Sequence, residues 1–229
     1  GFIAEGIESG RFEYMFFSIN DWMRSWDNEV PNAPPEGWQN RYPNFENDTF
    51  VFENCKNVTL YHSFSYGQGT GVRLEGNIEN FHGIGVGIDM GRHSLILNNS
   101  GAGNVFVNTE FSSWENNILA NESYSGETTF YVSSCWFSDN AVTSTFNGSG
   151  TVNIQQFHMQ KGSFTANAGT VNLQGLLMDG LSGYAVVIGG AKGGVINSLG
   201  GINSFLLDGT ASENFIVENC VKRLFEEVS

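Results

Sequence analysis

Apolar residues recur along the second half of the chain as pairs at positions i and i+2, each pair followed by a polar or glycine turn. The pairs end at Val132, Ile154, Leu173, Ile196 and Val217, with intervals of 22, 19, 23 and 21 residues. A strand with this alternation turns one face inward, so we expect these five side chains to be buried in one stack. The segments between them are too short and too rich in Gly and Asn for a helical crossover, which needs about 10–12 residues.

Parallel strands that repeat in this way without helices predict a solenoid, in which each coil of the chain lays its strands on the coil before. The composition agrees, because 29 Gly against 4 Pro suits corners that need left-handed backbone. Phe52 and Leu74 continue the repeat into the first half of the chain, and residues 94–99 predict a further strand.

The repeat is irregular between about residues 75 and 130, because the 36 residues from Ile96 to Val132 are neither one coil nor two. We expect Phe106 or Val107 to start a strand, followed by a loop near Glu115 to Thr128.

The three cysteines follow similar apolar hexapeptides, which run from Phe50 to Cys55, from Phe130 to Cys135 and from Phe215 to Cys220. Equivalent positions in a solenoid stack several strands apart, whereas a disulfide needs Cα atoms within about 7 Å. We therefore predict that Cys55, Cys135 and Cys220 are buried, unpaired thiols.

Strands such as Val217-Glu218-Asn219-Cys220, Asn-Gly corners and coils of about 19–23 residues resemble the right-handed parallel β-helix superfamily of pectate lyases, polygalacturonase-related proteins and phage tailspikes. The resemblance implies an all-β, single-stranded right-handed parallel β-helix and a carbohydrate partner. The stretch from Gly1 to Phe12 already looks like a coil in progress, so we expect a processed form or a fragment of a longer protein. The catalytic motifs of polygalacturonases and pectate lyases are not found in the sequence.

The charge balance narrows the range of partners. The chain has 24 acidic residues against 10 basic ones, a formal net charge of −14. A nucleic-acid partner is excluded because binding phosphates needs clustered Lys and Arg. No apolar run is long enough to insert in a membrane. A strongly anionic polymer such as pectate would be repelled at long range unless metal ions intervene.

One set of candidate catalytic residues follows the strands of the last coils. Asp139, Lys161 and Asp179 fall at nearly the same place after their strands, and His158 precedes Lys161 by three residues. Stacked coils would line them up on one face, where the Asp pair could act as acid and base of a hydrolase and Lys161 or His158 could serve a lyase. The competing interpretation, which the local sequence favours, is that Asp139, Lys161 and Asp179 occupy ordinary turns.

A second constellation, from Asp89 to His93, places an acid, a cation and a base within five residues. It follows the glycine-rich run Gly83–Gly87, which is not a dinucleotide fingerprint because no helix pattern follows. A local salt bridge between Asp89 and Arg92 is the more economical interpretation.

The chain from about residue 20 to 48 differs from the rest, because it contains all four prolines and several aromatic residues. We interpret residues 1–229 as one β-helix domain with this segment as an inserted loop. Exposed aromatic rings stack on the apolar faces of sugars, so the loop supplies candidate substrate-binding residues, although the same rings could instead seal the solenoid flank. These residues are Trp22, Trp26, Trp38 and Tyr42.

The sequence thus favours a protein that is secreted or displayed on a cell or virion surface and that processes a polysaccharide as a glycoside hydrolase or polysaccharide lyase. The alternative is a non-enzymatic carbohydrate-binding or structural β-helix, such as a tailspike shaft or adhesin. We expect no cofactor, although calcium held by stacked Asp and Asn oxygens is compatible with the pattern. The expected state is a monomer or a β-helix trimer.

Overall fold

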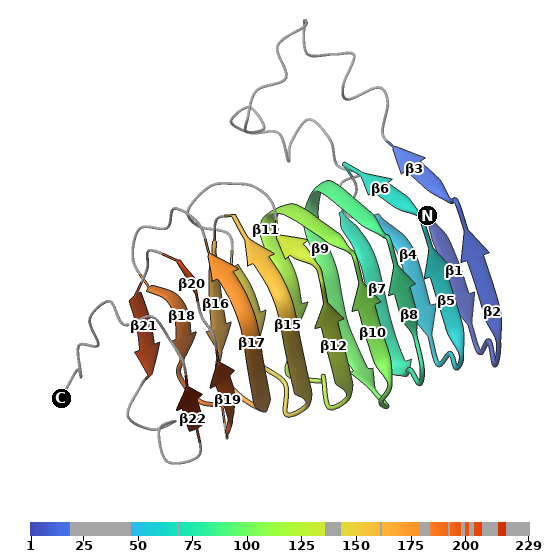
Figure 1. The fold of residues 1–229 in the computed structure, drawn as a ribbon. Coiled ribbons are helices and arrows are strands. Elements are labelled where there is room, and N and C mark those ends of the chain that lie inside the picture. The colour runs from blue at the N-terminus through green and yellow to red at the C-terminus, as the bar shows by residue number, and fades with distance from the viewer. Residues whose placement is uncertain are drawn as a thin grey trace, which may run out of the picture.

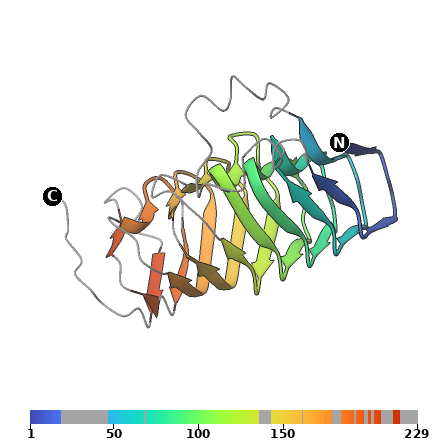
Figure 2. The same ribbon diagram turned by 90° about the horizontal axis from the view of Figure 1, so that it is seen from above.

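The protein forms a parallel β-solenoid in the computed structural model, and its described part contains no helix. Successive strands follow one another along the solenoid axis from β1–β3 at one end to β21 and β22 at the other (Figures 1 and 2). The structure describes residues 1–18, 47–67, 69–135, 143–160, 162–178, 184–191, 193–197, 200–201, 204–207 and 215–218.

Each coil of the chain passes through three parallel sheets, here named I, II and III in the order in which the chain visits them. Sheet I contains β1 (Phe2–Glu5), β4 (Asp48–Glu53), β7 (Thr70–Asn77), the second halves of β9 (Gly87–Ser100) and β11 (Glu110–Ala120), β14 (Thr143–Phe146), β16 (Ser163–Ala166), β18 (Tyr184–Ile188) and β21 (Ser204–Leu207). Sheet II contains β2 (Gly10–Glu13), β5 (Val58–Tyr61), β8 (His82–Ile84), β10 (Asn104–Val107), β12 (Glu127–Tyr131), the first halves of β15 (Thr151–Met159) and β17 (Thr170–Met178), β19 (Gly194–Asn197) and β22 (Phe215–Glu218).

Sheet III completes each coil. It contains β3 (Phe16–Ser18), β6 (Phe64–Tyr66), the first halves of β9 and β11, β13 (Ser134–Cys135), the second halves of β15 and β17, and β20 (Gly200–Gly201). The strands β9 and β11 run on from sheet III into sheet I, whereas β15 and β17 run on from sheet II into sheet III. The inserted segment predicted at about 20–48 joins β3 to β4, and residues 19–46 lie outside the described residues.

The core is a set of apolar columns, one on the inner face of each sheet. In sheet II the pairing runs Phe106↔Phe130, Phe130↔Ile154 and Ile154↔Leu173, and these four side chains are fully buried. The rings of Phe106 and Phe130 stack with centroids 5.5 Å apart. Burying a Phe side chain contributes about 1.5–3 kcal/mol, so such columns are the main source of stability in a fold without helices.

The predicted stack is confirmed for Ile154 and Leu173, and the backbones of Ile196 and Val217 continue it in register. The prediction is wrong for Val132, which is 44% exposed, because Phe130 occupies the corresponding position in the core. Strand β12 ends at Tyr131, and Val132 turns the corner with a left-handed φ of 47°. Its side chain therefore leaves the inward phase of the strand. The side chains of Ile196 and Val217 lie outside the described residues.

The stretch that is irregular in the sequence also contains register shifts in the pairing of β11 with β9 and β14. The interval of 36 residues arises because Ile96 lies in sheet I, whereas Val132 follows a strand of sheet II.

The strand predicted to start at Phe106 or Val107 is present as β10, but it begins two residues earlier, at Asn104. Phe106 in this strand pairs with Phe130. The loop predicted near Glu115 to Thr128 is wrong over its first part, because β11 continues to Ala120. The steps to Leu74 and to the strand at residues 94–99 are confirmed by the pairings Phe52↔Leu74 and Leu74↔Leu97.

Cys55 and Cys135 are buried and unpaired, as predicted, while Cys220 lies outside the described residues. Burial raises the pKa of the Cys135 thiol, so it remains protonated. The hexapeptides before these two cysteines are not structurally equivalent. The first forms β4 of sheet I, whereas the second runs from β12 in sheet II to β13 in sheet III.

Candidate functional site

A column of residues with left-handed backbone forms the corner between sheets II and III. One such residue turns the chain from one sheet to the next in each of seven coils. The column comprises Tyr14, His62, Gly85, Asn108, Val132, Gln156 and Gly175. A Tyr or a Val in this conformation is an outlier, because its Cβ crowds the neighbouring carbonyl oxygen.

The glycine-rich run Gly83–Gly87 crosses this corner in one coil and leaves it without bulk. A Cβ atom added at Gly85 would lie 2.5 Å from Cδ2 of His62, and one added at Gly87 would lie 2.5 Å from Cδ2 of Phe64. The two rings of the preceding coil therefore lean over the glycines. The run serves close approach of side chains to backbone, which explains the sequence feature that did not fit a nucleotide-binding loop.

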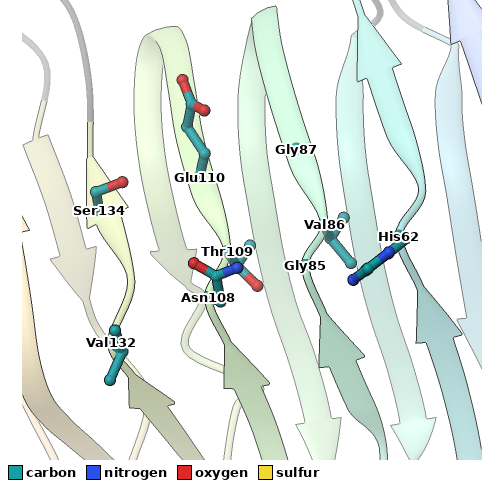
Figure 3. Close-up of a pocket in the computed structure, with 9 residues that line it drawn as sticks. All are labelled: His62, Gly85, Val86, Gly87, Asn108, Thr109, Glu110, Val132 and Ser134. Atoms are coloured by element: carbon teal, nitrogen blue, oxygen red, sulfur yellow. The ribbon is translucent and has the colours of Figure 1, made fainter.

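A hollow of about 450 Å³ opens where these side chains are missing. Figure 3 shows His62 extending across Gly85, with Asn108, Thr109 and Glu110 on the coil beyond. Val86 and Gly87 add to its lining, and Val132 and Ser134 belong to the next coil. The polar groups in the hollow are thus an imidazole, an amide, two hydroxyls and one carboxyl.

Glu110 is the acid of the hollow. It begins β11 and points outward, because the next residue, Phe111, is fully buried in the core. The Glu110 side chain is exposed at the hollow. Partial desolvation by the surrounding protein raises the pKa of its carboxyl, and the negative charge of Asp89 on the neighbouring coil raises it further. Across the described residues no Lys, Arg or His lies within salt-bridge distance of Glu110. Such a carboxyl holds its proton to higher pH than an ordinary Glu.

Asp89 lies at the end of the sheet III part of β9, where its backbone pairs with that of Tyr66. The pKa of the Tyr66 phenol is raised by burial and then by the charge of Asp89. Asp89 thus raises the pKa of acidic groups on both neighbouring coils, Tyr66 on one side and Glu110 on the other. A carboxyl whose pKa is raised by a neighbouring carboxylate is a feature of sites that separate an acid from a base.

The outward column of sheet III continues beyond Glu110 to Ser134 and His158. His158, one of the candidates from the sequence, is half-buried in β15 and lies beside Ser134 in the register. It therefore belongs to the same face as Glu110, two strands away, or ~10 Å at the usual strand spacing.

The other sequence candidates cannot be placed. Asp139, Lys161 and Asp179, and the aromatic residues Trp22, Trp26, Trp38 and Tyr42, lie outside the described residues. Whether the three charged residues share a face with His158 stays a prediction.

The constellation from Asp89 to His93 is divided by the corner between sheets III and I. Arg92 forms an ion pair with Glu115 of the next coil, with Nε–Oε1 at 2.8 Å, and His93 Nε2 lies 3.7 Å from Oε2 of the same carboxylate. Burial lowers the pKa of His93. The predicted partner of Arg92 was Asp89 within the same coil. In the structure Arg92 pairs instead with Glu115 of the next coil, and this ion pair links the two coils.

Within the part of the chain that the structure describes, no three His, Cys, Asp or Glu side chains gather as a metal site would require. The same residues contain no helix long and apolar enough to span a bilayer. No family model matches the chain, and the comparisons with curated proteins and with solved structures give no match either.

Sequence reasoning missed His62, Tyr66 and Glu110. The sequence signal that could have found them is their distance of about one coil from the glycine run. Phe64, Gly87 and Glu110 pair in succession on neighbouring coils. That signal is visible only once the coil register between residues 75 and 130 is known.

Proposed function

We propose that the protein is a secreted polysaccharide-processing protein of the kind found in the pectate lyase and polygalacturonase superfamily, and that its acid–base chemistry takes place at the hollow beside Glu110. The observation that carries the proposal is the carboxyl pair Glu110 and Asp89, in which the pKa of Glu110 is raised. Cleavage of a glycosidic bond needs one carboxylic acid to protonate the leaving oxygen and one carboxylate to act as base or nucleophile.

Glu110 suits the acid role because partial desolvation and a neighbouring negative charge both favour its protonated form. Asp89 suits the second role as the neighbouring carboxylate that provides this charge. His62, Asn108 and Ser134 line the same hollow and supply donors and acceptors for sugar hydroxyls. The hydrolase is favoured over the lyase because no lysine or arginine is found at this hollow among the described residues to neutralise the carboxylate of a uronic acid.

The test is a panel of neutral and acidic polysaccharides, assayed for new reducing ends and for the ultraviolet absorbance of unsaturated uronic products. On any substrate that is cleaved, Glu110→Gln and Asp89→Asn should each lower turnover by a factor of about 100 or more. Glu75→Gln is the matched control, since Glu75 is a carboxylate on sheet I that pairs with Arg73 at 3.4 Å. Equal turnover in wild type, Glu110→Gln and Asp89→Asn would remove the hollow from the mechanism.

A second candidate function is carbohydrate binding without cleavage, as in a tailspike shaft or adhesin. It is favoured by the aromatic side chains that stack on the outer face of sheet III near the N-terminal end, where Phe16 and Phe64 lie with parallel rings. Retention of oligosaccharides without any product in the panel would select this function.

A further inference from the structure

The outward column of sheet III changes character along the solenoid axis. It begins with Phe16 and Phe64, passes Gly87 and then reaches Glu110, each residue paired in register with the next. These side chains face away from the core, since Ser65, Ile88 and Phe111 alternate with them and are buried. The column therefore presents two aromatic rings, a gap and an acid in a straight line.

The two rings stack on one another on the outer face of sheet III, with Phe64 half-buried. The centroids of Phe16 and Phe64 are 5.6 Å apart with an interplanar angle of 9°, and Tyr66 extends the stack from Phe64 at 6.3 Å. Phe16 is 66% exposed. Neighbouring apolar groups that are exposed together often mark an interaction site.

Gly87 connects this surface to the hollow. Its missing side chain lets the ring of Phe64 lean over the backbone of the next coil, where an added Cβ would lie 2.5 Å from Cδ2 of the ring. No side chain thus separates Phe64 from Glu110, which lies two strands away, or ~10 Å at the usual spacing. That length accommodates neighbouring sugar units of one chain.

We propose that Phe16 and Phe64 form a sugar-binding subsite on the N-terminal side of the hollow, and that the ligand is an uncharged glycan lying along the solenoid axis. This inference rests on the proposed function, which it deepens by naming the substrate class and its direction. The C–H face of a pyranose is apolar and packs on an aromatic ring, while the edge hydroxyls remain free for polar partners.

The charge of the site selects the uncharged glycan over a uronate. Asp89 provides negative charge next to the subsite, and the net charge of the whole chain is −14. An anionic polysaccharide on this face would bring like charges together, whereas a neutral one meets only hydrogen-bonding groups and rings.

The experiment measures binding apart from cleavage, in a Glu110→Gln background that keeps the shape of the side chain. An array of neutral and uronate oligosaccharides identifies the tightest neutral ligand, which is then titrated by calorimetry. We expect Phe16→Ala and Phe64→Ala to weaken its binding by about tenfold each, and Phe64→Tyr, which keeps the ring, to change it less than twofold. Leu177→Ala is the matched control, because Leu177 lies in the same outward column beyond His158 and is 48% exposed.

The inference would be overturned by tighter binding of uronates than of any neutral glycan, or by no binding of neutral glycans. Unchanged binding in both Ala variants at wild-type melting temperature would overturn it as well. Sedimentation of the same variants tests whether the exposed rings instead mediate self-association. Loss of a dimer in Phe16→Ala with unchanged glycan binding would also overturn the inference. Failure of the proposed function is a separate outcome. It would appear as unchanged turnover in Glu110→Gln while the Ala variants still lose binding.

Discussion

Two corners of the solenoid use the same left-handed backbone, but only the second also places aromatic and β-branched residues in it. Between sheets I and II the left-handed positions in the first coils are occupied by Gly6, Asn54, Gly76, Asn57 and Asn80. Between sheets II and III they include Tyr14, His62, Val132 and Gln156. Gly and Asn adopt this conformation at little steric cost, whereas a β-branched or aromatic residue is strained by about 1–2 kcal/mol.

The two corners also differ in what their side chains contact. Asparagines at the first corner bind the neighbouring coil, as in the bonds from Asn80 Nδ2 to Asn57 Oδ1 at 3.1 Å and from the Asn77 amide to Asn54 Oδ1 at 3.0 Å. The second corner lines the hollow, and His62 and Val132 contribute to its wall. The first corner stabilises the stack of coils, and the second holds unfavourable conformations next to the candidate site, a distribution that is common where binding is the purpose of a segment.

The largest effect on stability is expected when a β-branched residue is placed at the corner between sheets I and II. Asn54→Val puts a β-branched side chain at φ 52° and removes the acceptor of the bond from the Asn77 amide. We expect the free energy of unfolding to fall by about 1–2 kcal/mol, measured by urea denaturation. Asn54→Gly, which keeps the backbone conformation and loses only the hydrogen bond, is the control and should fall by less.

The reciprocal exchange, Val132→Asn, should stabilise the protein. The Asn side chain tolerates the φ of 47° at this position, and the side chain that is lost is 44% exposed and contributes little to the core. We expect a gain of about 0.5–1 kcal/mol in the same unfolding measurement. A loss of stability would mean that the packing of Val132 outweighs its backbone strain. The second corner would then carry no net energetic cost relative to the first.

Val132 also shows why the fold could be predicted from the sequence more completely than its register. Phe130 and Val132 are both apolar and have the same parity along the strand, so a period of two residues is satisfied by either. The choice depends on where the corner falls, which is a matter of backbone conformation at a single residue. The parallel solenoid and the buried positions of Ile154 and Leu173 did not depend on that choice, because the interval between coils determines them.

The candidate site depended on the register entirely. Glu110 follows Thr109 in a sequence with no motif around it, and only the pairing with Gly87 brings it to the hollow. The glycine run was visible in the sequence, but its meaning required knowing that the rings of His62 and Phe64 lie over it. Side chains that meet across coils carry no local signal, because each lies about 23 residues from its neighbour.

The smallest effect expected is the pH dependence that Glu110 gives to stability and turnover. The folded state raises the pKa of Glu110 above its ordinary value, so the folded protein binds this proton more tightly than the unfolded chain does. The resulting stability is fully present below the ordinary pKa of Glu, about 4.3, and is lost as the pH rises through the raised value. Relative to Glu110→Gln, the wild type should therefore lose stability on going from pH 4 towards neutrality.

Turnover provides the sharper form of the same test. If Glu110 donates the proton, activity falls on the alkaline side of its raised pKa. Asp89→Asn removes the like charge that contributes to this raised pKa, so the alkaline limb of its residual activity should shift to lower pH. Two outcomes would show that the two carboxyl groups do not act on each other. One is an alkaline limb of the activity profile that is unchanged in Asp89→Asn. The other is a stability difference between wild type and Glu110→Gln that does not vary with pH. The corner between sheets II and III would then hold strained residues beside an ordinary surface acid.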